Sequence, residues 1–284
     1  MKYRLFLFCC VLAIFFVTSC GKGPSGIIDI DNPSGTGRIQ PVTNGHEYVD
    51  LGVRYNGNKI LFATMNIGAS SPEDFGDYFA WGETSKRYTR IEGKTVIGKP
   101  FDLNYAPYHT GSDRSSGWSK YIPIGSAFRY FGCVVDNKLT LDPEDDVASV
   151  LWGGDWRMPD REHLAMLTVD SVVDCRWVSN YNSTNTVGLL ITGKGDYSSA
   201  SIFLPAAGWC FEERLIGCID SFDGLEYHGS YWSRTVDLRV SADAWIYFFS
   251  EHGEPSYENI IAMGTEFRES GLPVRPVIVV PDNE

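Results

Sequence analysis

The sequence lacks the short motifs by which the common enzyme classes are identified. It contains no G-x-S-x-G nucleophile elbow, no H-E-x-x-H metal motif and no G-x-x-x-x-G-K-[ST] phosphate loop. Its 5 histidines are widely spaced, and none pairs with another at the spacing of metal ligands on a helix. These absences predict a protein that is not an enzyme and holds no metal or other cofactor. A glycan-processing enzyme stays open as an alternative, because only the three-dimensional structure sets the separation of a catalytic carboxylate pair.

Basic residues are also scarce relative to acidic ones. The chain has 24 Lys and Arg against 36 Asp and Glu, which gives a net charge of −12. Nucleic acids and anionic lipid headgroups both require clustered positive charge, so neither is an expected direct ligand. The sequence has no C-x-x-C pair either, and this absence argues against a redox motif or a paired-cysteine zinc knuckle.

The apolar run at the N-terminus is too short to span a bilayer comfortably, since a spanning helix needs about 20 apolar residues. Lys2 and Arg4 precede an almost unbroken apolar stretch, residues 5–17, and small residues then lead to Cys20. This arrangement is typical of a secretory signal, and the residues before Cys20 resemble a bacterial lipobox. We therefore expect residues 1–19 to be removed and Cys20 to carry the lipid, with an ordinary cleaved signal as the alternative. The protein would then be exported and held on the cell envelope, which we expect to be the outer membrane, in either leaflet.

The part of the chain after the signal divides into a tether and one domain. Residues 20–44 are rich in Gly, Pro, Ser and Asn, which predicts a flexible tether. Residues 45–284 are enough for a single domain with its own core. Aromatic residues make up 14% of the chain and there are 29 glycines, so we expect short strands, tight turns and long shaped loops.

Four cysteines follow Cys20, namely Cys133, Cys175, Cys210 and Cys218. An even number in an exported chain permits two disulfides, with three possible pairings. Cys210 and Cys218 enclose a short loop of charged residues, and we favour that pair. Burial of all four as free thiols is the alternative.

Strand-like patterns lie before and after two short predicted helices, which indicates the α+β class. One helix is expected to open at Asp142, with Asp142 as N-cap and Pro143 in the first turn, and the other to begin at Asp160. The acidic residues after Asp142 could alternatively bind calcium. Residues 83–141, here named the insertion, show no clear periodicity, and such long loops are usually functional or disordered. The strand-like runs are residues 46–51, 59–66, 78–81, 176–178, 187–192, 201–204, 231–233, 244–249 and 273–280.

Two tryptophans straddle two glycines just before the second predicted helix. The glycines permit a sharp turn with little side-chain bulk, and the tryptophans supply large apolar areas on either side of it. The planar fork of the arginine that follows can hold carbonyl groups or a carboxylate. We predict that this turn is structural rather than catalytic. It comprises Trp152, Gly153, Gly154, Trp156, Arg157 and Pro159.

Eight segments of the chain occur in an order that resembles one known family. They are residues 48–52 (YVDLG), 63–69 (ATMNIGA), 72–83 (PEDFGDYFAWGE), 143–146 (PEDD), 152–159 (WGGDWRMP), 203–208 (FLPAAG), 231–233 (YWS) and 274–277 (VRPV). Together they resemble the Fibrobacter succinogenes major paralogous domain family. The resemblance implies a C-type-lectin-like fold, with twisted antiparallel sheets, two helices and long loops, and no established activity. The calcium-binding signatures of C-type lectins are absent, as is the paired-cysteine segment of the formylglycine-generating enzymes.

Aromatic and acidic side chains gather in the glycine-rich segment 205–231. We expect Trp209, Phe222, Tyr227 and His228 to form a ligand face, because aromatic rings flanked by carboxylates suit stacking on sugars or peptide side chains. The long loop region of C-type-lectin-like folds is also where ligands usually bind, so the resemblance indicates the same segment. The alternative is that these aromatic residues belong to the core and the acidic ones are merely solvated.

The sequence therefore predicts a non-catalytic binding or adhesion module. Its expected partners are the membrane, through the lipid on Cys20, and a glycan or protein ligand. A structural subunit of a surface appendage, assembled through exposed strand edges, is a further alternative.

Overall fold

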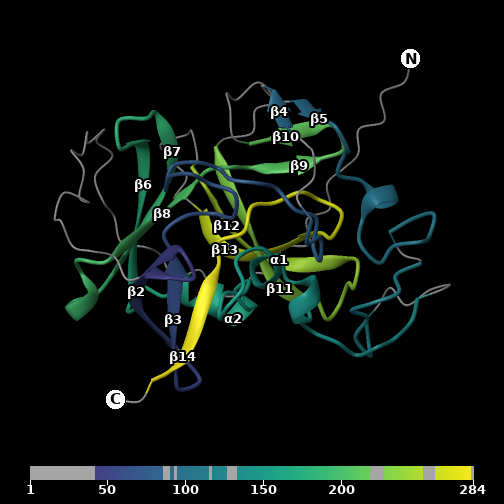
Figure 1. Ribbon diagram of the computed structural model, residues 1–284, viewed down its shortest axis with the longest axis horizontal. Helices are drawn as coiled ribbons and strands as arrows, with labels where there is room; N and C mark the ends of the chain where they lie inside the picture. Colours follow the sequence, from purple (N-terminus) through teal and green to yellow (C-terminus); the bar gives the residue numbers. More distant parts are fainter. Residues whose placement is uncertain are drawn as a thin grey trace.

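The computed structural model describes residues 42–85, 90–92, 95–114, 117–126, 133–217, 227–251 and 260–282. Within these ranges, the strands form four antiparallel sheets (Figure 1). The first has the order β1-β2-β3-β14 and contains β1 (Val42–Thr43), β2 (His46–Tyr55), β3 (Asn58–Ala63) and β14 (Val277–Pro281). The second has the order β11-β12-β13 and contains β11 (His228–Val236), β12 (Asp243–Ser250) and β13 (Ile260–Phe267).

The other two sheets lie toward the periphery in Figure 1. One has the order β6-β7-β8 and contains β6 (Val173–Tyr181), β7 (Thr186–Gly193) and β8 (Ser201–Pro205). The other has the order β4-β5-β10-β9 and contains β4 (Arg90–Glu92), β5 (Thr95–Ile97), β10 (Arg214–Ile216) and β9 (Trp209–Phe211). The helices described are α1 (Val147–Leu151) and α2 (Arg161–Ala165), with short 3₁₀ turns at Leu103–Tyr105, Pro143–Asp145, Met166–Thr168 and Gly195–Tyr197. Mostly antiparallel strands with two short helices agree with the predicted α+β class.

Two strand layers are buried on both faces and separate two apolar clusters. In β12, Ala244 and Ile246 belong to a first core cluster, whereas Tyr247 and Phe249 belong to a second. The same alternation occurs in β3, where adjacent residues join different clusters. Successive side chains of a strand point to opposite faces. A strand that lies between two cores therefore has apolar residues at nearly every position of its sequence. This is the pattern that the sequence shows at residues 59–63 and 244–249.

One buried arginine connects three parts of the chain. Arg275 is 1% exposed, and its guanidinium donates to the side-chain oxygen of Asn66 and to backbone carbonyl groups of Ala63, Thr64 and Phe203, at 2.9–3.1 Å. These bonds link the end of β3 and strand β8 to the approach to β14. A buried guanidinium is tolerated only when its donors are satisfied, so this residue fixes the relative positions of the strands around it.

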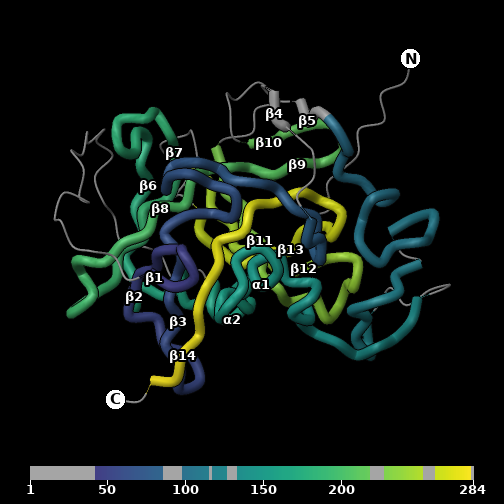
Figure 2. The backbone as a smooth tube through the Cα atoms, in the orientation of Figure 1, coloured from purple at the N-terminus to yellow at the C-terminus, as the bar shows by residue number. Residues whose placement is uncertain are grey.

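The insertion forms one side of the molecule, opposite β6 and β7 (blue to teal in Figure 2). Its described part includes β4 and β5, which the sequence analysis did not predict, and β5 pairs with β10 through Thr95 and Arg214. Short strands of this kind gain their stability from pairing rather than from their own periodicity. The insertion is therefore joined to the segment that the sequence predicts as the ligand face.

Candidate functional site

The turn from Trp152 to Pro159 connects α1 to α2 and is built into the core. Gly153 and Gly154 have φ values of 66° and 60°, which lie in the left-handed region that favours glycine. The rings of Trp152 and Trp156 meet edge to face at 5.0 Å, and both side chains belong to the first core cluster. The arrangement has the structural character that the sequence predicts for this turn.

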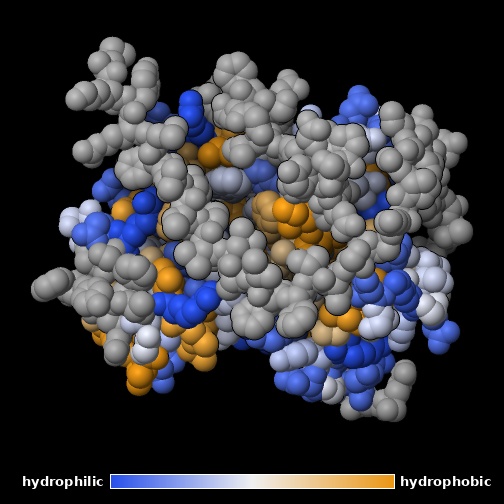
Figure 3. Space-filling view, turned by 180° about the vertical axis from the view of Figure 1, so that it is seen from behind, coloured by the Kyte–Doolittle hydropathy of each residue, from blue (hydrophilic) through white to orange (hydrophobic). Residues whose placement is uncertain are grey.

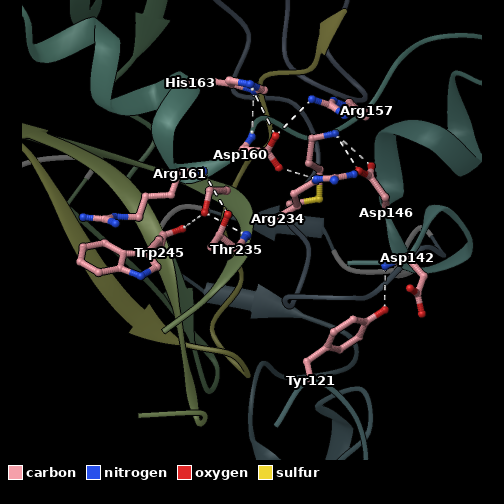
Figure 4. A network of polar contacts seen from close by, with 12 residues as sticks. Tyr121, Asp142, Asp146, Arg157, Asp160, Arg161, His163, Arg234, Thr235 and Trp245 are labelled. Atoms are coloured by element: carbon pink, nitrogen blue, oxygen red, sulfur yellow. Dashed lines mark hydrogen bonds and ion pairs between the residues drawn. The ribbon is translucent and has the colours of Figure 1, made fainter. Parts of the chain in front are cut away.

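Arg157 extends this turn into a polar network (Figure 4). Its Nη2 donates to Oδ2 of Asp160 at 3.1 Å, and Arg234 Nε donates to Oδ1 of the same carboxylate at 2.6 Å. Asp160 caps α2, as predicted, and its backbone N–H donates to Nδ1 of His163 at 3.2 Å. Burial lowers the pKa of His163 to about 4, so the imidazole is neutral and able to accept this bond. These hydrogen bonds connect the turn to α2 and β11, although Nε of Arg157 is buried and has no hydrogen-bond partner within the described ranges.

A helical turn opens at Asp142 with Pro143 at its start, as predicted, but it is the 3₁₀ turn Pro143–Asp145, and the α-helix begins only after Asp146. Asp142 makes no capping hydrogen bond, and Asp146 is the N-cap of α1. Oδ1 of Asp146 accepts from the backbone N–H groups of Ala148 at 2.9 Å and Ser149 at 3.1 Å. Its carboxylate also accepts from the backbone N–H of Met158, in the tryptophan turn, at 2.9 Å. The buried carboxylate that bridges two segments takes the capping position, whereas the more exposed Asp142 pairs with lysines.

Asp142, Glu144 and Asp145 form a group here named the lysine-paired cluster. Their carboxylate oxygens lie within 4.8 Å of one another, a spacing that a metal ion could use. In the structure, the ammonium group of Lys120 contacts Asp145 and lies 2.9 Å from Oδ2 of Asp142. Lys138 adds a second ion pair to Asp142. In the structure, the ammonium groups of Lys120 and Lys138 therefore neutralise negative charge of these carboxylates. A calcium ion was the alternative considered for that role.

Two tyrosine hydroxyl groups complete the lysine-paired cluster. Tyr108 and Tyr121, both from the insertion, donate to Asp145. Tyr121 also accepts from the backbone N–H of Asp142 at 2.9 Å (Figure 4). Burial disfavours ionisation of Asp145, but the hydrogen bonds from Lys120 and the tyrosines outweigh it and lower the pKa. Hydrogen bonds from two lysines lower the pKa of Asp142 to about 2. The carboxylates of Asp142 and Asp145 are thus stabilised as anions.

A second acidic group, here named the buried carboxyl cluster, consists of Asp243, Glu266 and Glu269, of which Glu269 is fully buried and the other two are half-buried. The side chain of Glu269 is fully buried, and its Oε1 pairs with Nε of Arg114, whose side chain is 39% exposed. The Arg114 guanidinium also lies 4.2 Å from the ring centroid of Phe267. Oε2 of Glu269 and Oδ1 of Asp243 are buried, and neither has a hydrogen-bond partner within the described ranges. This cluster has fewer donors and cations than the first.

The charge states of the two clusters differ accordingly. Burial, together with the negative charge of Glu266, raises the pKa of Asp243 to about 7. Burial also raises the pKa of Glu266 to about 7, although the backbone N–H of Phe267 and the hydroxyl of Ser270 donate to its carboxylate. Burial raises the pKa of Glu269 despite its pairing with Arg114. Acidic groups that titrate near neutrality are concentrated at functional sites in proteins.

The hairpin of β9 and β10 meets the insertion beside this cluster. Phe101 and Glu212 exchange backbone hydrogen bonds of 3.0 and 2.8 Å. The Arg114 guanidinium lies 5.4 Å from the ring centroid of Phe211, at the end of β9. Residues from the insertion, from the predicted ligand segment and from the end of β13 therefore converge on one partly exposed arginine. We name Arg114, Phe211, Phe267 and Glu269 the candidate site.

The aromatic residues of the predicted ligand face are packed more closely than expected. His228 is 4% exposed, and its ring lies 4.5 Å from that of the half-buried Trp209. Tyr227 is half-buried and packs against the second core cluster. Phe222 lies outside the described residues. Trp209 and His228 are thus brought together as packing partners, which favours the alternative that these rings belong to the core.

The cysteine predictions rest largely on residues outside the described ranges. Cys20 and Cys218 both lie there, so the lipid and the Cys210–Cys218 disulfide stay predictions. Cys210 itself is buried in β9. Cys175 Sγ donates to the carbonyl oxygen of Leu167 at 3.5 Å, and Cys133 packs beside an apolar cluster around Trp118.

The residues of the candidate site were not recognised in the sequence. Arg114 lies in the aperiodic insertion, and β13 was not predicted because its sequence, IIAMGTEF, has little alternation of polar and apolar residues. Phe211 lies within the predicted segment but was not selected. The best available signal was the charged sequence Glu266 to Glu269, which is unusual between two apolar segments.

Comparison with known proteins does not assign the chain to a family. No family model, curated protein or solved structure matches it. The resemblance described above therefore rests on the sequence motifs alone. Among the described residues, no helix has the length and apolar character needed to cross a membrane.

Proposed function

We propose that this chain is a lipid-anchored protein of the bacterial cell envelope that acts as a non-catalytic binding or adhesion module. The anchor is Cys20, and the support for it is the basic head, short apolar stretch and lipobox-like break at the N-terminus. The body has a C-type-lectin-like fold in this proposal. The antiparallel sheets, two short helices and long insertion are compatible with that fold.

The observation that carries the binding proposal is the environment of Arg114. Its guanidinium is partly exposed, stacks on Phe267 and lies where the insertion meets the β9–β10 hairpin. A stacked arginine presents fixed donors for a planar carboxylate or a sugar hydroxyl. The neighbouring hairpin tip carries the exposed side chains Glu212 and Glu213, which add acceptors at the rim. The ligand classes that fit are glycans and extended peptides.

Two further observations bear on the alternatives. The carboxyl groups of Asp243 and Glu266 have pKa values of about 7, as general acids do, but Oδ1 of Asp243 and Oε2 of the neighbouring Glu269 are buried. The binding module is thus favoured over the glycan-processing enzyme. Apolar side chains gather near the centre of the rear face (orange in Figure 3), and exposed apolar surface of this kind often contacts a partner.

The anchor is tested by replacing the lipid-bearing residue. Cys20→Ala should release the protein from the membrane fraction or stall its processing, because the signal is cleaved only after lipid attachment in this proposal. Membrane fractionation and mass spectrometry of the N-terminus measure both effects. A variant that is processed and bound as tightly as the wild type contradicts the anchor.

The ligand face is tested with Arg114→Lys, which keeps the charge and removes the planar fork. Glycan and peptide arrays with the Cys20→Ala protein first identify a ligand. Arg114→Lys should then weaken its binding by about tenfold, which is about 1.4 kcal/mol, with little change in melting temperature. Arg176→Lys, an exposed arginine on β6 on the opposite side of the molecule, is the matched control. Equal binding by the two variants would place the ligand elsewhere.

A further inference from the structure

The buried carboxyl cluster lies where three segments of the chain are joined. Asp243 begins β12, and its carbonyl accepts from the backbone N–H of Asp237 at 2.9 Å, which closes the turn after β11. The backbone N–H of Arg268 donates to the carbonyl of Ala242 at 3.0 Å, which joins this turn to the residues after β13. Arg114 brings the insertion to the same place through Glu269. A negative charge on the cluster therefore affects the turn after β11, the residues after β13 and the insertion together.

Two other cations lie near this cluster without an ion pair to it among the described residues. Arg268 is fully buried, its guanidinium lies 4.2 Å from the Trp118 ring centroid, and its Nη1 donates to the carbonyls of Lys120 and Ser241, whereas its Nε and Nη2 have no hydrogen-bond partner within the described ranges. Arg239 is mostly exposed and lies 3.6 Å from the carboxylate of Asp237. Arg114 remains as the cation paired to the cluster itself. The titratable and charged groups that face the cluster within the described ranges are Asp237, Arg239, Arg114, His109 and Arg268.

The sign of the pH effect follows from burial. A carboxyl group whose pKa is higher in the folded state than in the unfolded state binds its proton more tightly when folded. Its stabilising contribution is complete below the unfolded pKa, near 4, and is lost as pH rises through the folded pKa. For Asp243 and Glu266, with folded pKa values of about 7, the loss falls between about pH 4 and pH 7.

We propose that Asp243 and Glu266 form a pH-sensitive latch beside the Arg114–Glu269 ion pair. When protonated, these two groups add no charge next to Glu269, so the turn from Asp237 to Asp243 and the Arg114 segment close on the ends of β12 and β13. When ionised, they repel each other and Glu269, and Oδ1 of Asp243 draws water because it has no donor in the closed structure. The closed form therefore dominates in mildly acidic surroundings, and the open form becomes populated in alkaline ones. The latch acts without a ligand, so its test is independent of the binding proposal.

The test is amide hydrogen exchange at about pH 6 and about pH 8.5, corrected for the intrinsic pH dependence of exchange. In the wild type, protection of residues 237–243 and of the amides around Arg114 should fall by about tenfold at the higher pH, while β2 and β3 stay protected. In the Asp243→Asn/Glu266→Gln variant, protection should be the same at both values. Asp196→Asn, an exposed carboxylate removed from the cluster, is the matched control and should behave as the wild type does.

Two results would overturn the latch. One is equal protection of the wild type at both pH values, and the other is a double variant that keeps the wild-type difference. Carboxyl carbon-13 NMR of the wild type provides a measurement that does not depend on any variant folding. Titration of Asp243 and Glu266 near their ordinary value of about 4 would equally refute the proposal.

Discussion

The lysine-paired cluster and the buried carboxyl cluster both join the insertion to the rest of the domain, yet their electrostatics are opposite. In the first, Lys120 and the hydroxyl groups of Tyr108 and Tyr121 surround Asp145, and its pKa is lowered. In the second, burial dominates, and the pKa of Asp243 is raised to about 7. Both clusters contain three acidic residues, close together in sequence in the first and drawn from β12, β13 and the residues after β13 in the second. The number of hydrogen-bond donors that the fold brings to each carboxyl group decides whether that group is ionised or protonated.

The difference also separates two ways of attaching a loop. A carboxylate that receives several donors is a fixed joint, because removing it leaves those donors unsatisfied in a buried place. A carboxyl group with too few donors is a conditional joint, since its stability depends on whether it holds a proton. The insertion makes one contact of each kind. Its Lys120 pairs with Asp145 in the fixed joint, and its Arg114 pairs with Glu269 in the conditional joint.

The largest expected effect is at the fixed joint. Asp145→Asn keeps the shape of the side chain but offers one acceptor oxygen in place of two, so at least one of the donors from Lys120, Tyr108 and Tyr121 loses its partner. We expect the free energy of unfolding to fall by about 2–4 kcal/mol at neutral pH. Urea denaturation followed by tryptophan fluorescence measures the change. A loss below about 0.5 kcal/mol would show that the lysine-paired cluster behaves as a solvated surface group.

A smaller effect is expected at the conditional joint. Glu269→Gln breaks the ion pair with the partly exposed Arg114, and it also removes a negative charge that raises the pKa values of Asp243 and Glu266. These consequences oppose each other, so the free energy of unfolding should change by less than about 1 kcal/mol. The same denaturation experiment, repeated across pH, should show a weaker loss of stability between about pH 4 and pH 7 than in the wild type. A penalty equal to that of Asp145→Asn would remove the distinction between the two joints.

Local chemistry explains the features that the sequence predicted well. The α2 start at Asp160 follows from a capping residue and the helix-compatible residues after it. The double-glycine turn follows from the only residue type that adopts positive φ without strain. The start of α1 was predicted too early, because Asp142 and Asp146 are both suitable caps. Only the contact of Asp146 with the distant N–H of Met158 selects between them.

By itself, the sequence determined the strand-rich α+β class, the tryptophan turn, the second helix start and the lack of common catalytic motifs. It also contains the N-terminal pattern on which the anchor proposal depends. Each of these features lies in a few consecutive residues. The tertiary structure alone decided that Arg114 meets Glu269 and that Lys120 meets Asp145. Those contacts join residues far apart in the chain, and the burial they create sets which carboxyl groups keep their protons, because the cost of a buried charge depends on its neighbours in space rather than in sequence.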